Sequence, residues 1–233
     1  MKVAILVYPG TWSERDFAHA FTVMGVEHEI VWHADADLRG FDAAIVPGGF
    51  SYGDHLRAGA IAKISPATRE LIRFASEGGW VMGSCNGFQI LCEAGLLPGA
   101  LVRNDHLEYR CDWIFCRVES EATPFTRGRG REVLRLPIGH GEGCWVADAE
   151  TVARVEANGQ VVLRYVDERG AATRDANPNG SVANIAAVRN EAGNVLGLMP
   201  HPERCVEDLL GGTDGLRLLN VLVSPRMVGA GAL

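Results

Sequence analysis

The chain has 233 residues, of which 47% are hydrophobic and 22% are charged, and its formal net charge is −7. This composition excludes a disordered chain, and no apolar run approaches the roughly 20 residues that span a bilayer. The negative charge argues against binding nucleic acid through an overall positive field. The length suits one compact domain over residues 1–233.

Strand-like and helical patterns alternate along the first hundred residues. In chain order, the expected elements are a strand at Val3–Tyr8, a helix at Asp16–Met24, strands at Glu27–Trp32 and Ala43–Val46, a helix at Pro66–Ser76, a strand at Trp80–Met82 and a helix that ends at Gly95. Alternation of this kind predicts parallel strands with helices on the faces of the sheet.

After residue 100 the pattern is mostly that of strands. Strand pairs are expected from about Leu101 to Val118, then strands at Val133–Leu136, Val161–Val166, Ile185–Val188 and Val195–Met199, and a closing helix at about Asp214–Leu222. Together the two halves predict an α/β fold, with a mainly parallel sheet flanked by helices and some antiparallel strands. The small residues of Val228–Leu233 predict a frayed tail.

Cys85 lies where an apolar stretch ends in Gly83-x-Cys85-x-Gly87 and a helical pattern follows at once. A strand, sharp turn and helix around a nucleophile need flanking glycines, because the backbone is strained there and side chains would collide. The positive end of the helix then favours a thiolate. The pattern therefore indicates a nucleophile, and a buried structural cysteine is the alternative.

His201 and Glu203 form the second candidate pair, in the run Pro200-His201-Pro202-Glu203. A residue before proline is pushed toward extended geometry, and residues i and i+2 of an extended chain point to the same side. Glu203 is therefore expected to orient His201 as the base for Cys85. A rigid surface turn is the alternative interpretation.

His140 is a rival for the role of base, because glycines flank it and Glu142 follows two residues later. No set of ligands has a recognisable metal spacing, so no metal is expected. The chain enters a strand from Lys2 without an export signal, which predicts a cytoplasmic location and reduced thiols. The six cysteines form no Cys-x-x-Cys pair: they are Cys85, Cys92, Cys111, Cys116, Cys144 and Cys205.

The run Gly83-x-Cys85-x-Gly87-x-Gln89, with the distant His201-x-Glu203, resembles the class I (triad) glutamine amidotransferases, which have a flavodoxin-like fold. Further runs resemble the glutaminase subunits of phosphoribosylformylglycinamidine synthase, the PurQ family, from Lys2 to about Leu222. These runs are Pro47–Asp54, Gly139–Gly143, Asn177–Ser181 and Gly211–Gly215.

The chain departs from this family after the first strand. The family usually carries Pro-Gly-Ser-Asn-Cys-Asp there, whereas this chain reads Pro9-Gly10-Thr11-Trp12-Ser13-Glu14. The departure leaves open what residues 11–14 do, including contact with a partner synthetase.

The resemblance implies that glutamine is hydrolysed to glutamate and ammonia through the triad of Cys85, His201 and Glu203. It places the oxyanion hole at the backbone amides of Gly49, Phe50 and Asn86, and glutamine binding at Gln89. The ammonia would pass to a large synthetase (PurL-like), which converts formylglycinamide ribonucleotide to formylglycinamidine ribonucleotide in purine biosynthesis, with a small accessory (PurS-like) subunit. ATP and Mg are expected on the synthetase and no cofactor here, because the loop at 47–54 lacks phosphate-binding motifs.

Two alternatives remain. One is another cysteine hydrolase of this fold, such as a γ-glutamyl hydrolase or a DJ-1-like protein, against which the runs at 47–54 and 177–181 argue. The other is a non-catalytic regulatory protein that kept the fold, against which the intact Cys85, His201 and Glu203 argue.

Overall fold

The computed structural model describes residues 1–223, so the tail expected at Val228–Leu233 lies outside the described residues. The strands are β1 (Lys2–Val7), β2 (Glu27–Trp32), β3 (Ala43–Val46), β4 (Trp80–Ser84), β5 (Ala100–Val102), β6 (Arg110–Val118), β7 (Val133–His140), β8 (Cys144–Val146), β9 (Val161–Val166), β10 (Ile185–Arg189) and β11 (Val195–Leu198). The helices are α1 (Glu14–Met24), α2 (Pro66–Ser76), α3 (Asn86–Glu93), α4 (Ala149–Ala157) and α5 (Gly215–Leu219), with short 3-10 turns between elements.

One nine-stranded sheet joins most of these strands in the order β2-β1-β3-β4-β11-β10-β9-β6-β7, and β5 pairs with β8 separately. The strands from β2 to β11 are parallel to their neighbours, and the pairs from β11 to β7 are antiparallel. The predicted fold class is therefore confirmed. Because Val46 pairs with Gly83 and Ser84 pairs with Leu198, the carboxyl ends of β3, β4 and β11 lie side by side.

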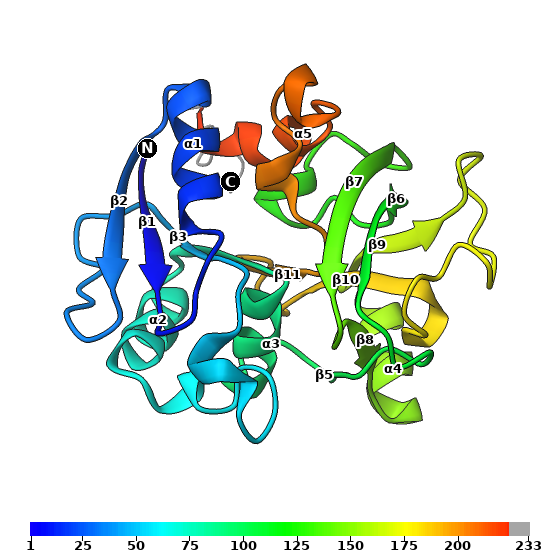
Figure 1. Cartoon of the computed structure of the whole chain (residues 1–233), viewed down its shortest axis with the longest axis horizontal. Coiled ribbons are helices and arrows are strands. Elements are labelled where there is room, and N and C mark those ends of the chain that lie inside the picture. The colour runs from blue at the N-terminus through cyan, green and yellow to red at the C-terminus, as the bar shows by residue number, and fades with distance from the viewer. Residues whose placement is uncertain (224–233) are drawn as a thin grey trace, which may run out of the picture.

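Helices cover both faces of the sheet. Figure 1 shows α1 and α5 on one side of the central strands and α2, α3 and α4 on the other. Helix α1 buries Phe17, Ala20 and Phe21 against β1 and β2, while α3 packs on β3, β4 and β11. Strands β3 and β11 are buried along their whole length, as expected for a parallel sheet covered on both faces.

Two parts of the middle region differ from the sequence prediction. Helix α4 was not predicted, although Asp148 caps it by accepting a hydrogen bond from the Thr151 amide at 2.7 Å. Its apolar stripe is too narrow to give a clear helical period, since it buries only Val155. The strands expected between Leu101 and Val118 exist, but β5 pairs with β8 while β6 pairs with β7 and β9.

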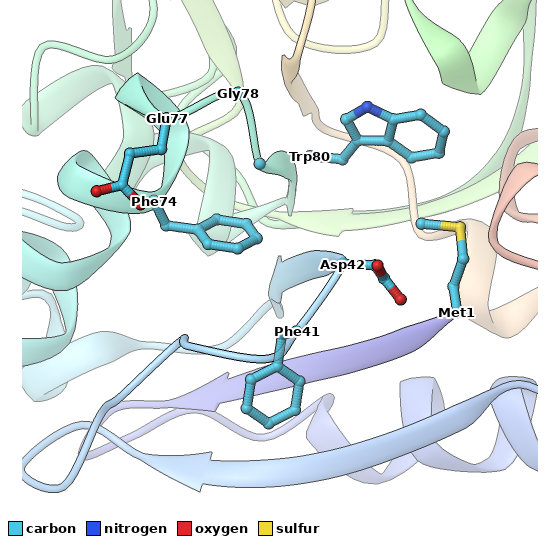
Figure 2. Close-up of a pocket in the computed structure, with 8 residues that line it drawn as sticks. Met1, Phe41, Asp42, Phe74, Glu77, Gly78 and Trp80 are labelled. Carbon is cyan, nitrogen blue, oxygen red and sulfur yellow. The ribbon is translucent and has the colours of Figure 1, made fainter. Parts of the chain in front are cut away.

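A cavity of about 380 Å³ lies at the amino ends of β1, β3 and β4. Figure 2 shows the Phe74 ring, the Trp80 indole and the Met1 side chain at its border. Trp80 begins β4, whereas Cys85 follows its last residue. The length of β4 therefore separates this cavity from the candidate nucleophile.

Candidate active site

Cys85 occupies a strained turn between β4 and α3. Its φ of 51° and ψ of −108° lie outside the usual regions for a residue with a side chain. A Cβ on Gly87 would lie 1.9 Å from the Val46 carbonyl oxygen, and one on Gly83 would lie 2.7 Å from the Gly87 carbonyl carbon. Both glycines are needed because α3 packs so closely against the ends of β3 and β4. The turn predicted from the sequence is thus present.

His201 and Glu203 form a buried pair. Nδ1 of His201 lies 2.6 Å from Oε1 of Glu203, and each side chain is 1% exposed or less. The backbone between them forms a 3-10 turn at Pro202–Arg204, and this turn, rather than extended alternation, brings the carboxylate to the ring. The contact that the sequence predicted is therefore made by a different backbone geometry.

Cys85 and His201 meet because β4 and β11 are neighbouring parallel strands. A Cβ on Gly48 would lie 2.7 Å from Cε1 of His201 and 3.4 Å from Cβ of Cys85, so both side chains border the same small space. Burial lowers the pKa of His201, but the charges of Glu203 and Cys85, together with the hydrogen bond to Glu203, outweigh it and raise the pKa. The arrangement favours the imidazolium form of His201 beside Cys85.

The loop after β3 lies against the residues that follow β1. The amide of Gly48 donates to Oγ of Ser13 at 2.7 Å, and the amide of Phe50 donates to the Gly10 carbonyl at 2.9 Å. The Phe50 amide, a predicted oxyanion donor, is therefore engaged within the protein. It could stabilise an oxyanion only if its bond to Gly10 broke.

Trp12 in the divergent segment reaches the active site. Its indole stacks on Phe50 with ring centroids 6.5 Å apart, and the Arg204 guanidinium lies 4.2 Å from its ring centre. Trp12 also lines the pocket that holds Cys85. The segment is distant from the triad in sequence but adjacent to it in space, a closeness that the sequence analysis missed.

Gln89 lies in the wall of this pocket, but its amide is bound within the protein. Its Oε1 accepts from Nδ2 of Asn86 at 2.8 Å, and its Nε2 donates to the Glu142 carbonyl at 2.7 Å. Gln89 thus ties α3 to the loop after β7. A direct role in binding glutamine stays a prediction, and its visible role is to shape the pocket.

The pocket has a volume of about 180 Å³ and opens at the carboxyl ends of the parallel strands. This is the edge at which open α/β sheets place ligands. Its lining combines the candidate nucleophile with carboxylates, a histidine, aromatic rings and glycines: Trp12, Gly49, Phe50, Asp54, Cys85, Gln89, Tyr109, Gly139, His140, Gly141 and Glu142. A small amino acid fits a space of this size and polarity.

His140, the rival base, has no carboxylate as a hydrogen-bond partner among residues 1–223. Its Nδ1 lies 3.1 Å from Oδ1 of Asn104, a residue that the sequence analysis did not single out. Burial, together with the positive charge of His201, lowers the pKa of His140 to about 4, so the ring is neutral at pH 7. The geometry therefore favours His201 as the base.

We expect His140 to make the protein less stable in mild acid. The pKa of His140 is about 4 in the folded protein against an ordinary 6.5, so the unfolded chain takes up the proton first as the pH falls. The contribution of His140 should therefore begin to lower the free energy of unfolding below about pH 6.5. At pH 5 the loss should be about 2 kcal/mol. Urea unfolding at pH 7 and pH 5 measures it, with His140→Phe as the variant without this titration. If the free energy of unfolding changed equally with pH in the wild type and in His140→Phe, the lowered pKa of His140 would be contradicted.

The sequence analysis also raised the state of the cysteines, metal binding and membrane spans. All six cysteines are free thiols, and burial raises the pKa of Cys92 and Cys116. Within residues 1–223, no cluster of three possible ligands could hold a metal ion. No helix in that same part of the chain is long and apolar enough to cross a membrane.

Comparisons with known proteins show which family this chain is similar to. Residues 1–211 match the CobB/CobQ-like glutamine amidotransferase domain family. The chain is 53% identical over 225 residues to phosphoribosylformylglycinamidine synthase subunit PurQ of Moorella thermoacetica, covering 96% of this chain and 95% of that protein. It is 54% identical to the Thermus thermophilus protein of the same name, covering 93% of this chain and 95% of that one.

Solved structures show the same likeness. A chain in the structure of PurLQS from Thermotoga maritima superposes with a TM-score of 0.84 at 43% identity, covering 95% of this chain and 97% of that one. A glutamine amidotransferase from the same organism gives a TM-score of 0.60 at 15% identity, covering 97% of this chain and 99% of that one, and this second likeness shows the fold alone.

Proposed function

The chain belongs to the PurQ family of glutamine amidotransferases, and from this premise we propose that it is the glutaminase subunit of phosphoribosylformylglycinamidine synthase. It hydrolyses glutamine and supplies ammonia for purine biosynthesis. The observation that carries the proposal is the buried His201–Glu203 pair, whose ring borders the same space as Cys85 at the carboxyl edge of the sheet.

The first half-reaction is acyl transfer to sulfur. The Cys85 thiolate attacks the side-chain amide carbon of glutamine, and a C–S bond forms. The negative oxygen of the tetrahedral intermediate is held by backbone amides, for which Gly49, Phe50 and Asn86 are the candidates. The imidazolium of His201 gives its proton to the amide nitrogen as the C–N bond breaks, so ammonia leaves and a γ-glutamyl thioester remains.

The second half-reaction restores the enzyme. His201, now neutral, takes a proton from water, and the oxygen attacks the thioester. The C–S bond breaks, glutamate departs, and Cys85 returns as the thiolate beside the imidazolium. Glu203 holds the ring in position and stabilises its positive charge, the role of the carboxylate in other triads.

The ammonia is used by a partner. The structure named PurLQS contains a chain closely similar to this one, which supports assembly with a PurL-type synthetase and, as a further part of the proposal, with a small PurS-type subunit. ATP and Mg would bind to the synthetase, and the complex would act in the cytoplasm. The comparisons favour this function over γ-glutamyl hydrolases, DJ-1-like proteins and a non-catalytic regulatory protein.

We expect the isolated chain to be a poor glutaminase that becomes active in complex with its synthetase. The amide of Phe50 is bonded to Gly10 at 2.9 Å, so one candidate oxyanion donor is turned away from the pocket until the loop shifts. Recovering one such donor is worth ~10²–10³ in turnover. Glutamate release is measured for the chain alone and with synthetase, the small PurS-type protein, ADP and formylglycinamide ribonucleotide.

The control is the same mixture with Cys85 alkylated beforehand, which should release no glutamate. Equal turnover with and without the partners would contradict gating by the loop. A complete lack of glutamate release in the complex would contradict the proposed function itself.

A further inference from the structure

His140 has a ring nitrogen that the catalytic triad does not use. The side chain is 3% exposed and lines the pocket that holds Cys85. Its Nε2 is buried and has no hydrogen-bond partner among the described residues, whereas Nδ1 is bonded to Asn104. A buried polar atom without a partner is costly, so its place in a substrate pocket indicates that a ligand satisfies it.

Asn104 determines which nitrogen of His140 carries the proton. Nδ2 of Asn104 faces the carbonyls of His140 and Glu108, each at 2.9 Å, and must be the donor because carbonyls only accept. Oδ1 accepts from the Gly143 amide at 3.0 Å, so the orientation of the Asn104 amide is fixed from both sides. Nδ1 of His140 must then donate to Oδ1, which leaves a lone pair on Nε2.

Carboxylates border the same pocket. Asp54 and Glu142 both line it, and burial together with the charge of Glu142 raises the pKa of Asp54 to about 6. The ion-pair partner of Glu142, Arg103, lies 3.7 Å away, and its side chain is 77% exposed. The lining of this one small pocket therefore combines two carboxylates with the buried ring of His140.

We propose that Nε2 of His140 and the carboxylates of Asp54 and Glu142 bind the α-ammonium group of glutamine. Asn104 is the positioning residue that keeps Nε2 an acceptor. The inference rests on the proposed glutaminase function, because glutamine supplies the cation. An ammonium group has three N–H donors and matches an acceptor-only site, while the amide end of the same molecule reaches Cys85.

The test compares glutamine with glutaramate, which is glutamine without its α-amino group. Glutamate or glutarate release by the complex with the synthetase gives kcat/KM for each substrate. Asp54→Asn, Glu142→Gln and His140→Phe should each lower kcat/KM for glutamine roughly 10- to 100-fold, the effect of losing one hydrogen bond to a charged group. The value for glutaramate should change less than about 3-fold, since that substrate never makes the bond.

Asn104 is tested through its coupling to His140. Asn104→Leu should lower the preference for glutamine over glutaramate as His140→Phe does. The double variant should lose no more than His140→Phe alone, because Asn104 acts through that ring. The rate at which iodoacetamide alkylates Cys85 should stay near that of the wild type, whereas general damage to the pocket would change it.

Asp35→Asn is the matched control, because Asp35 is exposed and is absent from the pocket lining. It should leave both substrates unaffected. If the pocket variants lowered kcat/KM for glutamine and glutaramate by the same factor, the α-ammonium site would be overturned and the glutaminase function would stand. If His140→Phe failed to fold, the two carboxylate variants would still decide the question. A wild-type complex that released no glutamate would instead overturn the proposed function.

Discussion

Cys85→Ala is expected to abolish glutamine-dependent synthesis in the complex while leaving synthesis from free ammonia intact. The physical reason is that only the glutamine half-reaction needs a sulfur nucleophile, and the thiol sits in this chain at the turn between β4 and α3. Alanine also removes the thioester intermediate, so the loss should reach the detection limit. Formylglycinamidine ribonucleotide is measured with glutamine and, separately, with an ammonium salt in mildly alkaline buffer.

Cys111→Ala is the control for this experiment, because Cys111 is an exposed thiol outside the pocket that holds Cys85. It should retain both activities. Continued hydrolysis of glutamine by Cys85→Ala would falsify the assignment of the nucleophile. Loss of the ammonia-dependent activity as well would show that Cys85 also maintains the complex, contrary to expectation.

His201→Ala should be nearly as damaging as Cys85→Ala, a loss of roughly 10⁴-fold or more in glutamine-dependent kcat/KM, because members of a triad act as a unit. Glu203→Ala should cost less, ~10²–10⁴-fold, since the ring keeps its chemistry but loses its orientation and counter-charge. The 2.6 Å contact between His201 and Glu203 is buried, so water cannot readily replace the carboxylate.

The Glu203→Ala variant also tests the charge state of His201. Glu203 raises the pKa of His201, so its removal should lower that pKa and leave less imidazolium beside Cys85 at pH 7. Iodoacetamide should therefore alkylate Cys85 more slowly in Glu203→Ala than in the wild type. His19→Ala, which removes an exposed histidine, is the control. If Glu203→Ala kept its glutamine-dependent activity while His140→Ala lost it, His140 rather than His201 would be the base.

The sequence alone singled out the candidate nucleophile and its two expected partners, because their signals are local. Glycines two residues to either side of Cys85 are required by close packing that any strand, turn and helix would impose. Prolines on both sides of His201 likewise restrict the backbone over a few residues. Most of the strands could be predicted for the same reason, since buried parallel strands are short apolar runs whatever their neighbours.

Only the tertiary structure decided which distant groups meet. The bond from Phe50 to Gly10 and the stacking of Trp12 on Phe50 join the loop after β3 to the segment after β1, which are far apart in the sequence. Asn104 and His140 are 36 residues apart, and nothing near either one in the sequence indicates the contact. Such contacts depend on strand order, which is set by non-local pairing. The sequence by itself therefore determined which residues are the catalytic candidates, and the packing of loops at the carboxyl edge of the sheet decided the shape, charge and donor set of the pocket.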